Sequence, residues 1–237
     1  MAGLNFVEGE VIGIDKPLGW TSFDAVKRVR GAIQRRLHVK KFKVGHAGTL
    51  DPLATGVLIV CTGKATRQIE SLQTGEKEYI ATIRFGASTP SHDLETEIDR
   101  TFPYSHITLE AIERVIPSFI GKIMQVPPIF SAVKIDGKRA YKYARKGKEV
   151  ELKAKPLEIK EMEILSWNSP DMVVRIVCSK GTYIRALARD LGEALDSGAH
   201  LIALKRTRVG DYRIDDCVSP DRAVAIIETV EIVTPES

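Results

Sequence analysis

Stretches in which apolar and polar residues alternate with a period of two recur along this chain, and helical stretches are interspersed among them irregularly. The clearest alternation covers Glu78–Gly86, where every second residue from Tyr79 to Phe85 is apolar, as on the buried face of a strand. A regular succession of strand and helix, which would indicate a parallel sheet, is absent. The pattern predicts an α+β fold, with a mixed, largely antiparallel central sheet flanked by helices.

Helices are predicted where a capping residue or a small-residue turn precedes apolar residues at helical spacing. Thr21, followed by Asp24, would cap the first of them. Its apolar residues recur at helical spacing and are Phe23, Val26, Val29, Ile33 and Leu37. The other predicted helices are Ala65–Leu72, Leu109–Phe119 behind Thr108, Tyr183–Leu195 behind Gly181-Thr182, and one that starts at Ser219-Pro220.

Strands and turns are predicted between these helices. The further strands are Val11–Ile14, Val57–Cys61, Glu149–Lys155, Leu157–Trp167, Met172–Ser179 and His200–Val209. Lys40–Thr55 is rich in glycine and is predicted to be a loop. Asp136-Gly137 is typical of a hairpin turn, and a short basic helix is expected around Ala140–Lys146.

The composition is that of an ordinary globular protein. Hydrophobic residues make up 43% and charged residues 28% of the 237 residues, which excludes disorder and collagen-like repetition. The three cysteines, Cys61, Cys178 and Cys217, form no CxxC pair and are interpreted as reduced thiols. No apolar run approaches the ~18 residues of a membrane span, and Met1–Glu10 has no signal-peptide pattern. We therefore expect a cytoplasmic protein.

Basic residues are concentrated in two segments. The first, between Ala25 and Leu50, contains no acid and holds Lys27, Arg28, Arg30, Arg35, Arg36, Lys40, Lys41 and Lys43. The second, from Lys134 to Lys155, holds nine basic residues against three acids, whereas seven acids follow from Asp211 onward against two arginines. This segregation favours a polyanionic partner, because each neutralised phosphate releases counterions. A merely solvated surface is the alternative.

Several common chemistries are not supported by the sequence. Gly63-Lys64 is not a P-loop, because that motif would require Gly at position 58 and Ser or Thr at position 65, where the chain has Leu and Ala. There is no GxGxxG and no GxSxG. The five histidines never fall at ligand spacing with another donor, so we expect no metal site.

The most informative segment is Gly45–Gly56 (GHAGTLDPLATG), which contains a single acid, Asp51. Its glycines permit close approach of the backbone to a ligand, and Pro52 restricts the turn after the acid. From local composition alone, the alternative is a turn in which Asp51 caps a helix and His46 is incidental.

This segment resembles the catalytic motif of the TruB family of tRNA pseudouridine synthases. Further segments resemble other family motifs in family order: Asp15–Ser22 (DKPLGWTS), Lys77–Tyr79 (KEY), Pro127–Lys134 (PPIFSAVK) with Arg139–Tyr141 (RAY), Ser179–Arg185 (SKGTYIR) and Gly198–Leu204 (GAHLIAL). The resemblance covers about residues 8–220. It implies the pseudouridine synthase fold and isomerisation of uridine 55 in the T loop of tRNA, after the base is flipped into a pocket, with no cofactor.

The resemblance also implies roles for individual residues. Asp51 would be the nucleophile, Arg185 its guanidinium partner and Tyr79 a ring that stacks on the base. Those expected in the substrate site are His46, Tyr79, Tyr183, Leu204 and Lys16, of which Lys16 would support the site. Those expected at the RNA backbone are Lys134, Lys138, Arg139 and Lys142. Without the resemblance, Tyr79 could be an ordinary core aromatic and Arg185 a surface arginine.

We expect one catalytic domain over residues 1–237, with an RNA-contacting insertion at about 124–155 and no C-terminal PUA domain. The T arm of tRNA is the expected partner of a monomer that needs no protein partner. Two alternatives remain: a guide-RNA-dependent, dyskerin-like enzyme, and an RNA-binding module with an idle catalytic loop. Whether the carboxylate attacks the sugar or the base, or promotes elimination to a glycal, stays open.

Overall fold

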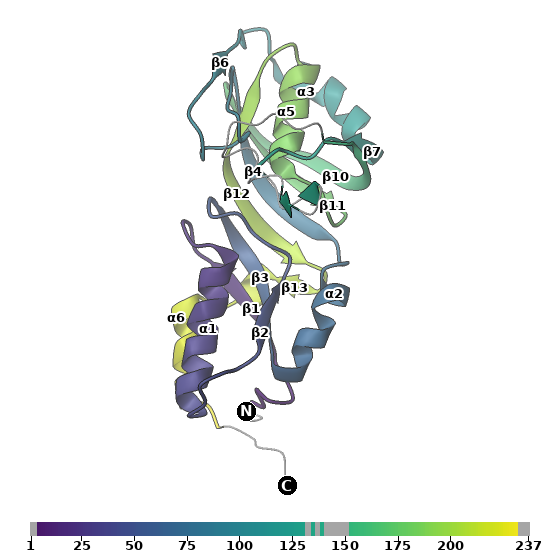
Figure 1. Ribbon diagram of the computed structural model, residues 1–237. Helices are drawn as coiled ribbons and strands as arrows, with labels where there is room; N and C mark the ends of the chain where they lie inside the picture. Colours follow the sequence, from purple (N-terminus) through teal and green to yellow (C-terminus); the bar gives the residue numbers. More distant parts are fainter. Residues whose placement is uncertain (1–3, 131–133, 136–137, 140–151, 232–237) are drawn as a thin grey trace. The chain divides into compact units, whose positions relative to one another are not determined.

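The computed structural model describes residues 4–130, 134–135, 138–139 and 152–231 (Figure 1). The chain forms two compact units. The first unit comprises Met1–Tyr79 and Lys205–Ser237, and the second comprises Ile80–Leu204. Strands β4 (Lys77–Phe85) and β12 (Ala199–Val209) each contribute residues to both units.

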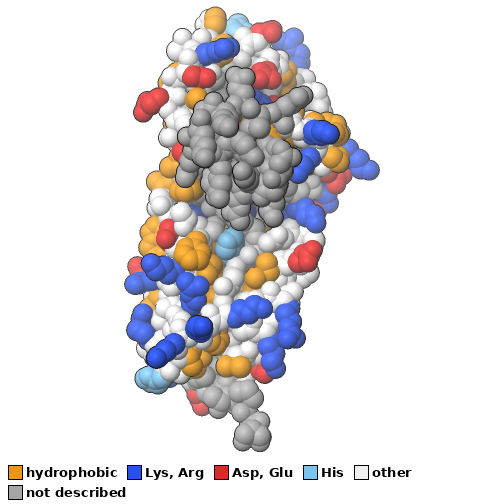
Figure 2. Space-filling view, in the orientation of Figure 1, with side chains coloured by type: hydrophobic (Ala, Val, Ile, Leu, Met, Phe, Trp, Pro, Cys, Tyr) orange, Lys and Arg blue, Asp and Glu red, His pale blue; other side chains and the backbone are white. Residues whose placement is uncertain are grey.

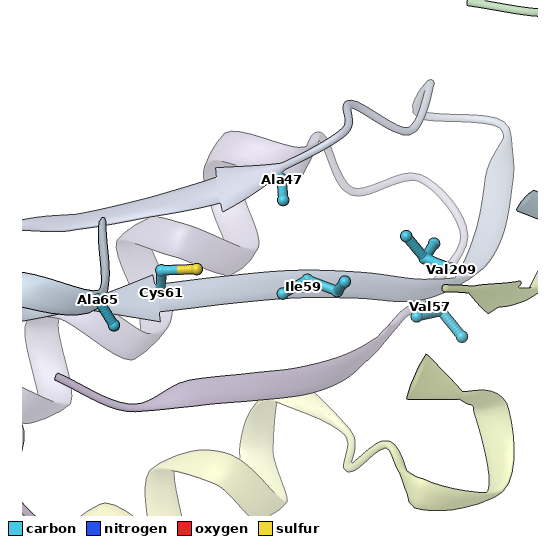
Figure 3. Close-up of a cluster of buried hydrophobic side chains, with 6 residues drawn as sticks. All are labelled: Ala47, Val57, Ile59, Cys61, Ala65 and Val209. Atoms are coloured by element: carbon cyan, nitrogen blue, oxygen red, sulfur yellow. The ribbon is translucent and has the colours of Figure 1, made fainter. Parts of the chain in front are cut away.

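The first unit is an antiparallel sheet with helices. Its strands follow the order β1-β3-β12-β4, with β2 paired to β3 and β13 to β12. Its elements are β1 (Val11–Lys16), α1 (Ser22–Arg36), β2 (Val44–Ala47), β3 (Ala54–Thr62), a 3-10 helix (Gly63–Gln68), α2 (Ile69–Leu72), β13 (Tyr212–Arg213), a 3-10 turn (Ile214–Asp216) and α6 (Pro220–Thr229). A buried cluster lies on this sheet and consists of Ala47, Val57, Ile59, Cys61, Ala65 and Val209 (Figure 3).

Strand β2 corrects the prediction that Lys40–Thr55 is a loop throughout. Residues Val44–Ala47 pair with Thr62–Ile59 of β3, and Ala47 is fully buried in the cluster. The sequence of β2, Val-Gly-His-Ala, has no alternation of apolar and polar residues, so only its pairing partner makes it a strand. The predicted helix Ala65–Leu72 is likewise a 3-10 helix followed by the short α2.

Helix α1 begins at the predicted cap. The Thr21 side chain accepts a hydrogen bond from the Asp24 amide, and the Asp24 carboxylate accepts one from the Thr21 amide, which completes a capping box. Val26, Val29 and Ile33 are buried as expected. Phe23 is not: its side chain is 57% exposed, because Ser22 and Ala25 occupy the inner face at this end of the helix.

Helices α1 and α6 lie side by side in the first unit (Figure 1). Ser219 caps α6 as predicted, by accepting a hydrogen bond from the Arg222 amide. Two exposed salt bridges join the helices: Arg28–Asp221 at 2.8 Å and Arg35–Glu228 at 2.9 Å. Part of the acidic C-terminal segment therefore neutralises part of the first basic segment.

The second unit is built on the strand order β12-β4-β11-β10-β7. Its further elements are β5 (Ala87–Ser88), β6 (Arg100–Thr101), α3 (Leu109–Val115) continued by a 3-10 turn (Ile116–Phe119), β7 (Gly121–Gln125), β8 (Lys134–Ile135), β9 (Lys138–Arg139), β10 (Lys155–Asn168), β11 (Asp171–Cys178) and α5 (Ile184–Ala194). The alternation on β4 is confirmed, since Tyr79, Ala81, Ile83 and Phe85 are buried. In α5 the apolar residues at helical spacing are buried as well: Ile184, Leu187, Ala188 and Leu191.

Four further predictions concern the second unit. The helix behind Thr108 ends at Val115, because Pro117 cannot continue the α-helical hydrogen bonding. Of the predicted strand Glu149–Lys155, residues 152–154 are irregular, so the prediction is wrong there, whereas Lys155 is the first residue of β10. The predicted hairpin is confirmed by the antiparallel pairing of β8 with β9, whereas the predicted helix at 140–146 lies outside the described residues.

The α+β fold with a largely antiparallel sheet is thus confirmed. Among the described residues, none of the helices combines the length and the hydropathy that a membrane span requires.

Candidate active site

Asp51 lies in the loop between β2 and β3, and this loop is anchored to the start of α1. The Gly19 amide donates to the Pro52 carbonyl at 2.8 Å. The Ser22 hydroxyl donates to the Leu50 carbonyl at 3.0 Å and accepts from the Leu50 amide at 2.8 Å. The element that follows Asp51 is a strand, so Asp51 does not cap a helix.

Lys16 is fully buried at the end of β1 and supports this region from inside. Its ammonium donates to the carbonyl oxygens of Pro17, at 2.9 Å, and Trp20, at 2.6 Å, which fixes the segment that Gly19 ties to the loop. Burial lowers the pKa of Lys16 to about 8. The Asp51 carboxylate opposes this shift of the pKa and Arg206 adds to it, so both charges act on the Lys16 ammonium.

Arg206 connects the start of the loop, at Gly48, to strand β3, at Val57. This residue of β12 is 1% exposed, and its Nε donates to the Val57 carbonyl at 2.8 Å while Nη2 donates to the Gly48 carbonyl at 2.9 Å. Gly56 makes the close approach possible: it has φ +99°, and a Cβ there would lie 2.2 Å from the Arg206 carbonyl oxygen. The buried guanidinium of Arg206 thus binds the loop through its hydrogen bond to Gly48.

His46 lies on β2 and is partly buried. Burial lowers its pKa, and the Arg206 charge lowers it further, so its imidazole is neutral at pH 7. Its Nδ1 is buried and has no hydrogen-bond partner in the described part of the chain. A neutral ring with an unused polar atom can pack against a nucleotide without competing for the charge of Asp51.

The buried ammonium of Lys16 predicts a specific pH dependence. The pKa of Lys16 is about 8 in the folded chain and ordinarily 10.5, so between these values the unfolded chain binds more protons. The free energy of unfolding of the wild type should therefore rise relative to that of Lys16→Met, by about 2 kcal/mol between pH 7.5 and 9.5. Urea denaturation at several pH values measures this difference. Parallel stability curves for the two proteins would contradict the buried charge.

Arg185 lies at the second position of α5 in the second unit, and only 6% of its side chain is exposed. It donates to the carbonyl oxygens of Phe130, at 2.9 Å, and Ser91, at 3.3 Å, and its Nε lies 3.6 Å from the Asp93 carboxylate. A cation at a helix N-terminus opposes the helix dipole, and Asp93 offsets this cost. The interpretation of Arg185 as a surface arginine is therefore wrong.

Tyr183 is the residue that precedes α5. Its amide donates to Oε1 of the buried Gln125 at 3.0 Å, and its carbonyl accepts from Nε2 of the same side chain at 3.2 Å. These two bonds to Gln125 fix the backbone at which α5 starts.

Two further predicted site residues lie on strands. Leu204 is partly buried on β12, and Tyr79 on β4 is 8% exposed.

The structure assembles the predicted residues in two groups. Lys16, His46, Asp51 and Tyr79 lie in the first unit, where Arg206 acts on Lys16 and His46. Tyr183, Leu204 and Arg185 lie in the second unit. The pairing of Asp51 with Arg185 remains a prediction, because the two residues belong to different units.

Arg206, Asp93 and Gln125 were not predicted from the sequence. For Arg206 a signal exists: it follows Leu204 by two residues on a strand and so shares its face. That signal is obscured by the surrounding basic residues Lys205 and Arg208. For Asp93 and Gln125 no local pattern distinguishes the residue from an ordinary polar one.

Most of the residues that are expected to contact the RNA backbone lie on the hairpin formed by β8 and β9. Lys134 pairs with Arg139, and Lys138 with Ile135, in the ladder between β8 and β9. Lys142 lies outside the described residues. Within the described ranges, no group of three His, Cys, Asp or Glu side chains could hold a metal ion.

Comparison with known proteins links this site to one family. A family model described as "TruB family pseudouridylate synthase (N terminal domain)" matches residues 34–184, and one described as "tRNA pseudouridylate synthase B C-terminal domain" matches residues 185–228. Together the two models include Asp51, Tyr79, Arg185 and Arg206.

Individual relatives are similar over nearly the whole chain. The "tRNA pseudouridine synthase B" of Phocaeicola vulgatus is 62% identical over 229 residues, which are 97% of each chain. That of Bacteroides fragilis is 60% identical over 97% of this chain and 98% of its own. A solved "Cbf5-Nop10-Gar1 Complex" contains a chain that is 30% identical, with a TM-score of 0.72. This chain matches over 93% of its own length and spans 55% of that one.

Proposed function

The chain belongs to the TruB family of pseudouridine synthases, and on this premise we propose that it converts uridine 55 in the T loop of tRNA to pseudouridine, with Asp51 as the nucleophile. Pseudouridine synthases are isomerases. The observation that carries the proposal is the anchorage of the Asp51 loop, which forms hydrogen bonds with Ser22, Gly19 and the buried Arg206. A loop bound so closely keeps a reactive carboxylate in one geometry.

The reaction needs only rearrangement of the substrate. The bond from N1 of the uracil to C1′ of the ribose breaks, the base turns, and C5 bonds to C1′. The proton that leaves C5 is balanced by the one gained at N1, so the product is an isomer. A carboxylate can serve by attack on the sugar or the base, or by promoting elimination to a glycal.

Other residues would hold the flipped base. Tyr79 stacks on the uracil, and Tyr183 and Leu204 line the pocket that holds the uracil. His46 packs against the RNA at the position that the flipped base has left. The burial of Tyr79 and the neutral ring of His46 support these roles. Arg185 would pair with Asp51, in keeping with its burial at the start of α5.

The substrate would be held by its phosphates. The hairpin residues Lys134, Lys138 and Arg139, together with Lys142, supply cations for the T arm. We propose that the protein acts on tRNA as a monomer in the cytoplasm, without a protein partner. The 62% identity to a protein named for tRNA, against 30% to the chain of the Cbf5 complex, favours this over a guide-RNA-dependent enzyme.

Turnover without additives tests the function. The purified chain is incubated with a tRNA transcript in the presence of a chelator, without guide RNA or nucleotide, and pseudouridine is mapped by position. We expect one pseudouridine, at position 55. A transcript with cytidine at that position is the control and should give none. Binding without product would favour the non-catalytic RNA-binding module, and product that appears only with a guide RNA would favour the dyskerin-like alternative.

A further inference from the structure

Helix α1 carries arginines and lysines on two faces that differ in their partners. Arg28 and Arg35 are seven residues apart, which places them on one face, two turns from each other. There they meet Asp221 and Glu228, which are likewise seven residues apart on α6. We name Arg28 and Arg35 the paired face; its charge is neutralised within the protein.

The second face consists of Phe23, Lys27 and Arg30, spaced four and three residues apart, and we name it the α1 stripe. Neither Lys27 nor Arg30 forms a salt bridge within the described part of the chain. The acid Asp24 acts electrostatically on Lys27, but its carboxylate is already engaged in the capping box with Thr21. The stripe thus keeps its positive charge.

An exposed aromatic ring accompanies this charge. The Arg30 guanidinium carbon lies 5.6 Å from the centre of the Phe23 ring, which leaves the cation above an aromatic face. Phe23 is 57% exposed, although it is a large apolar residue. A cation beside an exposed ring suits single-stranded nucleic acid, whose phosphates and bases offer a charge and a stacking surface at once.

The stripe begins where the catalytic loop is anchored. Ser22, which bonds Leu50 from the loop of Asp51, immediately precedes Phe23. From Phe23 to Arg30 the helix rises about 10 Å, so the stripe leads away from the loop by two turns. The exposed Lys40, Lys41 and Lys43 follow the helix in the chain. Figure 2 shows Lys and Arg side chains gathered over the region of α1.

We propose that the α1 stripe is a second RNA-binding surface, which holds the tRNA backbone on the side of the Asp51 loop and offers the Phe23 ring to an unstacked nucleotide. The proposal rests on the proposed function, because the RNA it names is the substrate of that site. Helix α6 directs the RNA to this side of α1, because its carboxylates neutralise the paired face.

Two double variants of the full chain test this surface. Lys27→Ala with Arg30→Ala removes two charges from the stripe, whereas Arg28→Ala with Arg35→Ala removes two charges from the paired face. Affinity for a tRNA transcript is measured by filter binding over a range of salt concentrations. The stripe variant should lower the slope of log K against log salt by about two, roughly one for each lost phosphate contact. The paired-face variant should keep the wild-type slope.

Equal slopes for the two variants would overturn the proposal, because net charge alone would then explain the binding. Thermal melting checks that each variant is folded, and Lys27→Gln with Arg30→Gln serves as a second stripe variant. Phe23→Leu should weaken binding without changing the slope, since it removes a ring and no charge. Product formation by the wild type is recorded separately: an active wild type with equal slopes refutes only this surface, and an inactive one with unequal slopes refutes only the isomerase.

Discussion

Asp51→Asn is expected to reduce pseudouridine formation to background while the affinity for tRNA stays close to that of the wild type. Asparagine keeps the size of the side chain but removes the charge and the nucleophilicity, and positioning alone cannot replace the lost step. Binding should survive because the phosphate contacts that we propose are made by basic residues outside this loop. Single-turnover pseudouridine formation and filter binding are measured on the same preparation.

Asp15→Asn is the matched control, because Asp15 also acts electrostatically on Lys16 and lies in the same unit. It removes a comparable charge and should leave turnover near normal. Substantial turnover by Asp51→Asn would refute the mechanism. If Asp51 were only a turn residue, asparagine would cost up to ~1 kcal/mol in the free energy of unfolding and would leave activity intact.

Arg206→Met should have the second large effect, on both stability and activity. The Gly48 and Val57 carbonyl oxygens would each lose a charged donor, and such bonds contribute about 1.5–3 kcal/mol apiece. The methionine variant no longer buries a charge, and the desolvation cost that it avoids offsets part of this loss. We therefore expect a net loss of about 2–4 kcal/mol in the free energy of unfolding. Turnover should fall by about 100-fold, because the loop of Asp51 loses its support.

Arg208→Met on the same strand is the control for this prediction. Arg208 is partly exposed, and its contacts with Glu76, at 3.8 Å, and with the Gly210 carbonyl, at 3.4 Å, are long, so a loss of about 1 kcal/mol or less in the free energy of unfolding is expected. Arg206→Lys should fall between the two, since a lysine keeps the charge but lacks the planar fork that reaches both carbonyls. Urea denaturation and turnover are measured for all three. Equal losses for Arg206→Met and Arg208→Met would show that the buried guanidinium does not support the loop.

Local patterns predicted most of the secondary structure. The capping box at Thr21, the alternation from Tyr79 to Phe85 and the cap at Ser219 each depend on residues a few positions apart. Such features are complete within one element, so they can be recognised before the chain is folded. The motif around Asp51 was recognisable for a related reason, because its resemblance to a family lies in consecutive residues.

The sequence did not reveal which residues support the site. Arg206 approaches Gly48 and Val57 across about 150 positions of the chain, and nothing around it marks it as buried. The strand β2 was missed because its four residues become a strand only by pairing with β3. Phe23 matched the helical spacing but is exposed, since the direction of the inner face depends on what α1 packs against.

The sequence by itself determined the fold class, the capped starts of three helices, at Thr21, Thr108 and Ser219, and the segment that carries Asp51. The tertiary structure alone decided that Arg206 and Lys16 are buried cations beside that loop. It also decided that Arg28 and Arg35 form salt bridges, whereas Lys27 and Arg30 form none with the residues that the structure describes. The physical reason is that propensity and periodicity act between neighbours in the chain. The burial of a charge and its partner depend on contacts between distant segments, which exist only after the chain has folded.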